Sequence, residues 1–123
     1  MSNTPFDPKN KFFPHEKLEA YQLARAAVQF VAARKGKLRG LPGQAGPQLE
    51  RAVVGAQTNL CAAAAHEGAE ARRLFRIAIS EASEAGGGAD LALDLGALSQ
   101  SEYVELRGIL LRLCATLVGL SRR

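Results

Sequence analysis

The feature that most constrains the fold is an apolar seam in the last quarter of the chain. Its side chains recur at alternating steps of three and four residues: Tyr103, Leu106, Leu110, Leu113, Leu117 and Leu120. This spacing puts them on one face of an α-helix and suits the core of a helix bundle. Ser99 and Glu102 form the S-x-x-E pattern of a capping box just before the seam. The sequence therefore predicts a helix that begins at Ser99.

Three more helices are predicted upstream by apolar residues at the same spacing. They cover about residues 15–34, 47–67 and 69–95. Ala, Leu, Glu and Arg dominate these segments, and all four are strong helix formers. The sequence predicts an all-α fold, an antiparallel up-down-up-down four-helix bundle over residues 15–123, after an extended arm over residues 1–14.

Glycine and proline interrupt this pattern in two places. Residues 35–48 contain four glycines and two prolines, which predicts a loop rather than a helix. Gly86–Gly88 lie inside the third predicted helix, where each glycine costs about 1 kcal/mol relative to alanine. Because the register of small residues continues across them, we expect a weakened but continuous helix.

The predicted arm holds two adjacent aromatic residues, Phe12 and Phe13, between Pro8 and Pro14. We interpret them as a packing anchor that fixes the arm to the bundle. A docking motif for another molecule is the alternative.

Basic residues form the main candidate binding site. Residues 1–40 carry eight Lys and Arg against three acids, a balance that favours an acidic partner such as nucleic acid. The candidate phosphate-binding residues are Lys35, Lys37, Arg39, Arg72, Arg73, Arg76, Arg122 and Arg123. We expect the predicted loop to offer its three cations. The acids Glu67, Glu70, Glu81 and Glu84 are instead expected to neutralise the arginines of the third helix.

Two polar residues in the second predicted helix, Arg51 and Asn59, lie on or beside its apolar stripe. A buried polar side chain needs a hydrogen-bond partner and can fix helix register. We expect these two residues to make structural polar contacts inside the bundle.

The sequence offers little to an enzyme. His15 and His66 lie in different predicted helices without a nucleophile motif, and Glu-x-x-His metal pairs are missing. We therefore expect no catalytic residue, metal site or cofactor. Cys61 and Cys114 sit among apolar neighbours and form no CxxC unit, which favours a reducing, cytoplasmic setting.

Four segments carry a resemblance to a known family. They are EKLEAYQLA at residues 16–24, QLERAVV at 48–54, LFRIAISEASE at 74–84 and LALDLGAL at 91–98. In order and spacing they resemble the four-helix-bundle proteins encoded in intervening sequences of large-subunit ribosomal RNA genes. That family is related to the accessory variability proteins of diversity-generating retroelements.

The resemblance implies a ring-shaped homopentamer that binds nucleic acid, RNA or DNA, and a nucleic-acid enzyme such as a reverse transcriptase. The sequence-based hypothesis is thus a non-enzymatic oligomeric adaptor with basic surface clusters. The alternative is a structural protein–protein interaction module that binds no nucleic acid.

Overall fold

The computed structural model describes residues 5–123, and the first four residues of the predicted arm lie outside this range. Within it every regular element is helical, so the all-α prediction is confirmed. The α-helices are α1 (Glu19–Ala33), α2 (Lys35–Arg39), α3 (Ala45–Ala64), α4 (Gly68–Asp94) and α5 (Gln100–Ser121). Two 3₁₀ turns, Pro14–Lys17 and Pro42–Gln44, precede α1 and α3.

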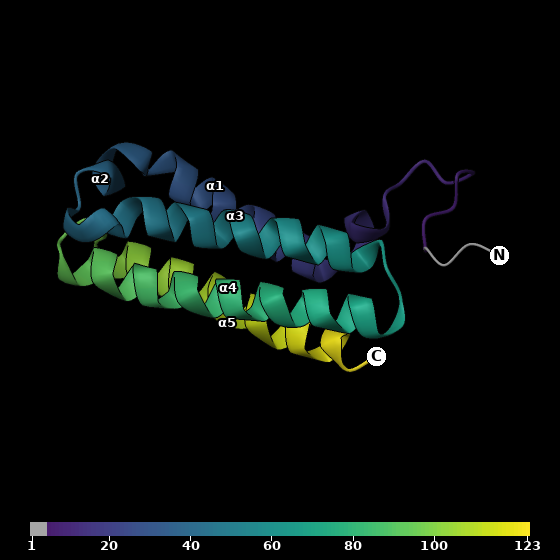
Figure 1. Ribbon diagram of the computed structural model, residues 1–123. Helices are drawn as coiled ribbons and strands as arrows, with labels where there is room; N and C mark the ends of the chain where they lie inside the picture. The colour runs from purple at the N-terminus through teal and green to yellow at the C-terminus, as the bar shows by residue number, and fades with distance from the viewer. Residues whose placement is uncertain (1–4) are drawn as a thin grey trace.

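The four long helices lie side by side along one axis (Figure 1). Helix α1 packs on α3 and α5, and α4 packs on the same two helices. The N-terminal arm, the α3–α4 turn and the C-terminal end of α5 lie at one end of the molecule (Figure 1). Helix α2 and the α4–α5 turn lie at the other end, so the two ends carry different segments of the chain.

The predicted loop over residues 35–48 is wrong in part, because the chain forms α2 there and begins α3 two residues before Pro47. The reason is tertiary packing. Leu38 of α2 is only 3% exposed. Its carbonyl oxygen lies against Gly46, so close that a Cβ at Gly46 would overlap it. A glycine at this point lets α2 pack directly on the backbone of α3.

The first predicted helix also begins later than expected. Residues Pro14–Lys17 form a 3₁₀ turn, and Leu18 is extended, with φ −87° and ψ 133°, before α1 begins at Glu19. The turn changes the direction of the chain between the arm and α1.

Helix α4 runs without interruption through Gly86–Gly88, as the sequence predicts. It ends at a Schellman motif. The N–H of Gly96 donates to the carbonyl of Leu93, and the N–H of Ala97 donates to that of Ala92. Gly96 adopts φ +82°, which the missing side chain permits.

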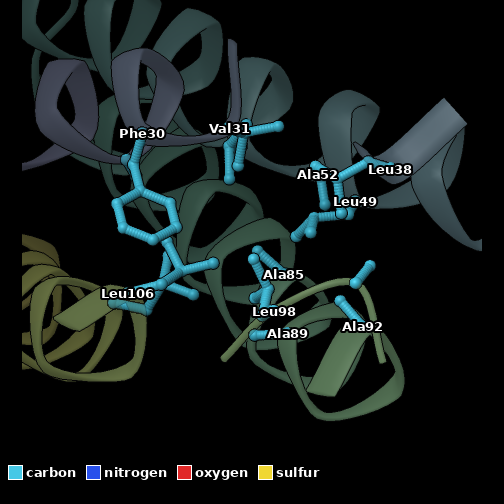
Figure 2. Close-up of a cluster of buried hydrophobic side chains, with 14 residues drawn as sticks. Phe30, Val31, Leu38, Leu49, Ala52, Ala85, Ala89, Ala92, Leu98 and Leu106 are labelled. Atoms are coloured by element: carbon cyan, nitrogen blue, oxygen red, sulfur yellow. The ribbon is translucent and has the colours of Figure 1, made fainter. Parts of the chain in front are cut away.

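The core divides into two clusters along the direction of the long helices. One lies towards α2 and includes Phe30, Leu49 and Leu106; its side chains converge from all five α-helices and the α4–α5 turn (Figure 2). The other lies towards the α3–α4 turn and includes Leu60 and Leu117. The predicted seam of α5 is confirmed, since its five leucines are all buried. Over residues 5–123 no buried side chain is polar or charged.

The interpretation of Phe12 and Phe13 as a packing anchor is wrong. Their side chains are 56% and 58% exposed and belong to neither core cluster. Among the described helices none combines the length and apolar character needed to cross a membrane.

Candidate nucleic-acid interface

The predicted basic loop is a helix whose lysines face carboxylates. Lys37 Nζ of α2 lies 2.9 Å from Oε1 of Glu102, at the first turn of α5. Lys35 Nζ lies 3.6 Å from Oε1 of Glu50 on α3. Arg39, the third cation of the group, is exposed and makes no ion pair within residues 5–123. We call α2 with its two acidic partners the lysine end.

Glu102 is the centre of the contacts at this end. Its carboxylate accepts hydrogen bonds from the backbone N–H of Ser99 at 2.9 Å, from Lys37, and from Nε of Arg34 at 2.5 Å. Its own N–H donates to Ser99 Oγ at 3.1 Å, so the predicted capping box is formed. The Ser99 N–H, and then Lys37 and Arg34, lower the pKa of Glu102 to about 2. The carboxylate therefore stays ionised and neutralises part of the positive charge of α2.

Arg34 adds an aromatic contact to the same arrangement. Its guanidinium lies 3.6 Å from the ring centroid of Phe30 and donates to the Phe30 carbonyl at 3.0 Å. A cation over a ring face gains electrostatic energy. Arg34 thus joins the end of α1 to the start of α5. Sequence analysis missed this role, because Arg34 and Glu102 are separated by 68 positions.

Four of the predicted arginines gather at the opposite end. Arg72 of α4 and Arg123 line a cavity of about 360 Å³ beside the α3–α4 turn. Arg76 of α4 and Arg122 line a neighbouring open groove of about 730 Å³ between α4 and the end of α5. We call these four residues the arginine surface.

The guanidiniums of the arginine surface form no ion pair with a carboxylate among residues 5–123. Glu67 lines the cavity and Glu84 lines the groove, without pairing. Only Arg73 is neutralised as expected: its Nη2 lies 2.8 Å from Oε1 of Glu70 and lowers the pKa of that carboxyl. Unpaired guanidiniums at the surface are suited to bind phosphate oxygens in a bidentate manner.

The expectation of internal contacts for Arg51 and Asn59 is not met within the chain. Arg51 is exposed on α3. Asn59 is half-buried, and its Nδ2 donates to the carbonyl of Gly55 at 2.8 Å, within the same helix. Neither side chain reaches the apolar interior, so neither fixes helix register in the way predicted.

The groups that could support catalysis or metal binding stay apart. In the described part of the chain no three His, Cys, Asp or Glu side chains gather as metal ligands would. His66 Nδ1 lies 2.7 Å from the carbonyl of Ala62, one turn back along the chain. Cys61 and Cys114 are free and half-buried, and burial raises the pKa of each thiol, which disfavours the reactive thiolate.

No protein-family model matches the chain, and no curated protein sequence matches it. In the search of solved structures it is similar to a protein of unknown function from the S23 ribosomal protein family of Bacteroides thetaiotaomicron. The TM-score is 0.76 at 14% sequence identity, over 85% of this chain and 99% of the other. At this identity the likeness shows a common fold.

Proposed function

We propose that this chain is a non-enzymatic adaptor that binds nucleic acid, or a nucleic-acid enzyme such as a reverse transcriptase together with its nucleic acid, through the arginine surface. One observation carries the proposal. Arg72 and Arg76 of α4, with Arg122 and Arg123 just after α5, line two pockets at one end of the molecule and form no ion pair within the described residues. Phosphate contacts made by such groups supply most of the affinity for nucleic acid without reading its sequence.

The proposal includes an assembly. The protomer is an up-down-up-down four-helix bundle, and five copies form a ring. The opposite directions of consecutive long helices in Figure 1 and the shared fold described above support the bundle. A ring would repeat the arginine surface, and linked weak contacts add up to a much higher avidity than one copy provides. A reducing, cytoplasmic setting is consistent with the two free thiols.

The test compares the two ends of the molecule. One variant carries Arg72→Gln, Arg76→Gln, Arg122→Gln and Arg123→Gln. The control carries Lys35→Gln, Lys37→Gln and Arg39→Gln. Binding to a fluorescent oligonucleotide is measured over a range of salt concentrations, and the particle mass is measured by light scattering. Wild-type protein should bind at moderate salt and lose affinity steeply as salt rises.

Each lost phosphate contact should flatten the slope of log affinity against log salt by about 0.7 to 0.9. We expect a large effect for the arginine variant and a small one for the lysine variant. Wild-type binding that occurs only at very low salt would contradict the proposal. A clean monomer or dimer would contradict the ring.

A second candidate function is a protein-interaction module without nucleic-acid binding. It is favoured by apolar side chains left exposed on α4 and α5. These are Leu91, Leu95, Val104 and Leu111, all more than 40% exposed. Under this alternative, Leu91→Ser and Leu95→Ser would abolish partner capture, whereas the arginine variant would leave it intact.

A further inference from the structure

A series of aromatic rings follows the N-terminal arm to the first turn of α1. Ring centroids lie 6.1 Å apart for Phe6 and Phe13, 5.6 Å for Phe13 and His15, and 4.6 Å for His15 and Tyr21. The planes of Phe13 and His15 are nearly parallel, at 6°. Together with Phe12 we call these residues the aromatic ladder. Four of its rings contact one another in chain order, and the ring of Phe12 lies beside Lys17.

The two adjacent phenylalanines of the ladder are open to solvent. Phe12 is 56% exposed and Phe13 58%, although each carries a large apolar ring. A side chain that stabilised the fold by burial would lose most of that exposed area. Exposed apolar rings that gather in one place mark a binding surface.

Cations accompany the rings. Lys17 Nζ lies 5.7 Å from the ring centroid of Phe12, and Arg25 Cζ lies 5.8 Å from that of Tyr21. Both distances are within the range of a cation–π contact. Lys9 is also exposed on the arm. Positive charge beside an aromatic face favours a partner that offers both a flat ring and a phosphate.

The ladder adjoins the arginine surface. Pro5 and Pro14, the neighbours of Phe6 and Phe13 in the chain, line the same 360 Å³ cavity as Arg72 and Arg123. The arm and the C-terminal end of α5 also lie at the same end of the molecule (Figure 1). The cavity beside the arginines therefore reaches the segment of the chain that carries the rings.

We propose that the aromatic ladder stacks unpaired bases of a single-stranded nucleic acid while the arginine surface holds its phosphates. The inference rests on the proposed function and names the class of nucleic acid. Proteins that bind single strands combine a cationic track with aromatic side chains on which the bases stack. In a duplex those base faces are covered by their neighbours. The cations around the rings favour a polyanion over an apolar protein segment.

The test measures fluorescence anisotropy of the full chain with four ligands of about 20 nucleotides. They are oligothymidylate, oligouridylate, a duplex, and an abasic phosphodiester chain of equal charge. Both single strands should bind about tenfold more tightly than the abasic chain, the effect of stacking one or two bases. A similar affinity for both single strands is expected because stacking does not require the 2′-hydroxyl.

The variant Phe12→Ala/Phe13→Ala should lower single-strand affinity about tenfold and leave duplex and abasic binding unchanged. Phe12→Trp/Phe13→Trp should retain the wild-type value, because it keeps the aromatic faces. The matched control is Val104→Ala, a side chain that is also 56% exposed but lies near the start of α5.

Failure of this inference can be told from failure of the proposed function. If all four ligands bind equally and Phe12→Ala/Phe13→Ala changes nothing, the arginine surface remains and base stacking is overturned. If no ligand binds at moderate salt, the proposed function is overturned, and the ladder's role with it.

Discussion

The lysine end and the opposite end of the molecule, which carries the arginine surface and is called the arginine end below, both present cationic side chains. The two ends differ in whether carboxylates pair with these cations. At the lysine end, Lys37 lies 2.9 Å from Glu102, and Lys35 pairs with Glu50. At the arginine end, the four guanidiniums of the arginine surface have no such partner in the described chain. The comparison teaches that the number of basic residues in a segment does not define a binding surface. The position of the acids in the fold decides which cations remain available.

The two ends also differ in how tightly they are built. At the lysine end α2 packs on the α3 backbone through Gly46, and Glu102 joins the start of α5 to Arg34 and Lys37. The arginine end is bordered by a cavity and an open groove. One end is thus organised by intramolecular contacts, whereas the other has open pockets lined by arginines that form no ion pair in the described chain.

The largest expected effect tests the tight packing of the lysine end. Gly46→Ala would make the new Cβ overlap the carbonyl oxygen of Leu38, so α2 would have to move away from α3. We expect the free energy of unfolding to fall by about 3 kcal/mol, as for severe overpacking. Urea denaturation measures it.

The control is Gly36→Ala, within α2, where no atom lies within 4 Å of the added Cβ. It should leave stability unchanged or raise it slightly. Equal stability of Gly46→Ala and wild type would show that α2 does not rest on the α3 backbone.

The next prediction adds carboxylates beside the arginine surface, whose guanidiniums form no ion pair in the described chain. Ser80 and Ser83 line the groove that holds Arg76 and Arg122. The variant Ser80→Glu/Ser83→Glu should pair with these arginines and lower nucleic-acid affinity about tenfold, or about 1.4 kcal/mol. Anisotropy titrations at fixed salt measure the change.

The matched variant Gln100→Glu/Val104→Glu adds the same charge to exposed positions near the start of α5. It should reduce affinity only slightly. Equal losses for the two variants would mean that net charge, rather than the arginine surface, controls binding.

A third prediction concerns the glycines of α4, whose buried neighbours Ala85 and Ala89 belong to the core cluster towards α2. At Gly86 an added Cβ would meet nothing within 4 Å, whereas at Gly88 it would lie 3.1 Å from Cδ1 of Leu49. Gly86→Ala should stabilise the chain by about 1 kcal/mol through helix propensity. Gly88→Ala should gain less or destabilise, because Leu49 is buried and must shift. Equal gains at both positions in thermal unfolding would refute close packing at Gly88.

The smallest effect concerns pH at the lysine end. The pKa of Glu102 falls from an ordinary 4.5 to about 2 in the folded chain. Because the folded pKa is the lower one, the stability from Glu102 is present above pH 4.5 and is lost between about pH 4.5 and 2. The urea midpoint of Glu102→Gln should lie below that of wild type at neutral pH, and the gap should close over this range. Glu105→Gln, at an exposed position on α5, is the control. A gap that is independent of pH would contradict the assignment.

Local signals in the sequence were sufficient to predict much of the fold. The cap formed by Ser99 and Glu102 and the leucine seam of α5 depend on residues three or four apart. The helical register across Gly86–Gly88 is equally local, and it predicted a continuous α4. Helix α2 was missed because the glycines and prolines of residues 35–48 suggest a loop, while the contact that holds the helix is with Gly46 of α3.

The candidate site was less predictable for the same reason. Residues Arg72 and Arg123 line one cavity although 51 positions separate them. The pairing of Lys37 with Glu102 spans 65 positions. Neither relation leaves a periodic signal in the sequence. The exposure of Phe12 and Phe13 could not be predicted either, because two phenylalanines in a proline-rich arm can be buried or exposed to solvent.

The wholly apolar interior of the described chain does not by itself fix how the helices are aligned along their axes. Alanine and leucine rows fit one another at several offsets, and no hydrogen bond inside distinguishes between them. The offset is therefore set by the backbone contact at Gly46 and by the hydrogen bonds that Glu102 and Tyr103 make to other helices. A variant that lacks the contacts of Gly46, Glu102 and Tyr103 would keep its helical circular dichroism. Its methyl resonances would lose dispersion as the helices slide among neighbouring alignments.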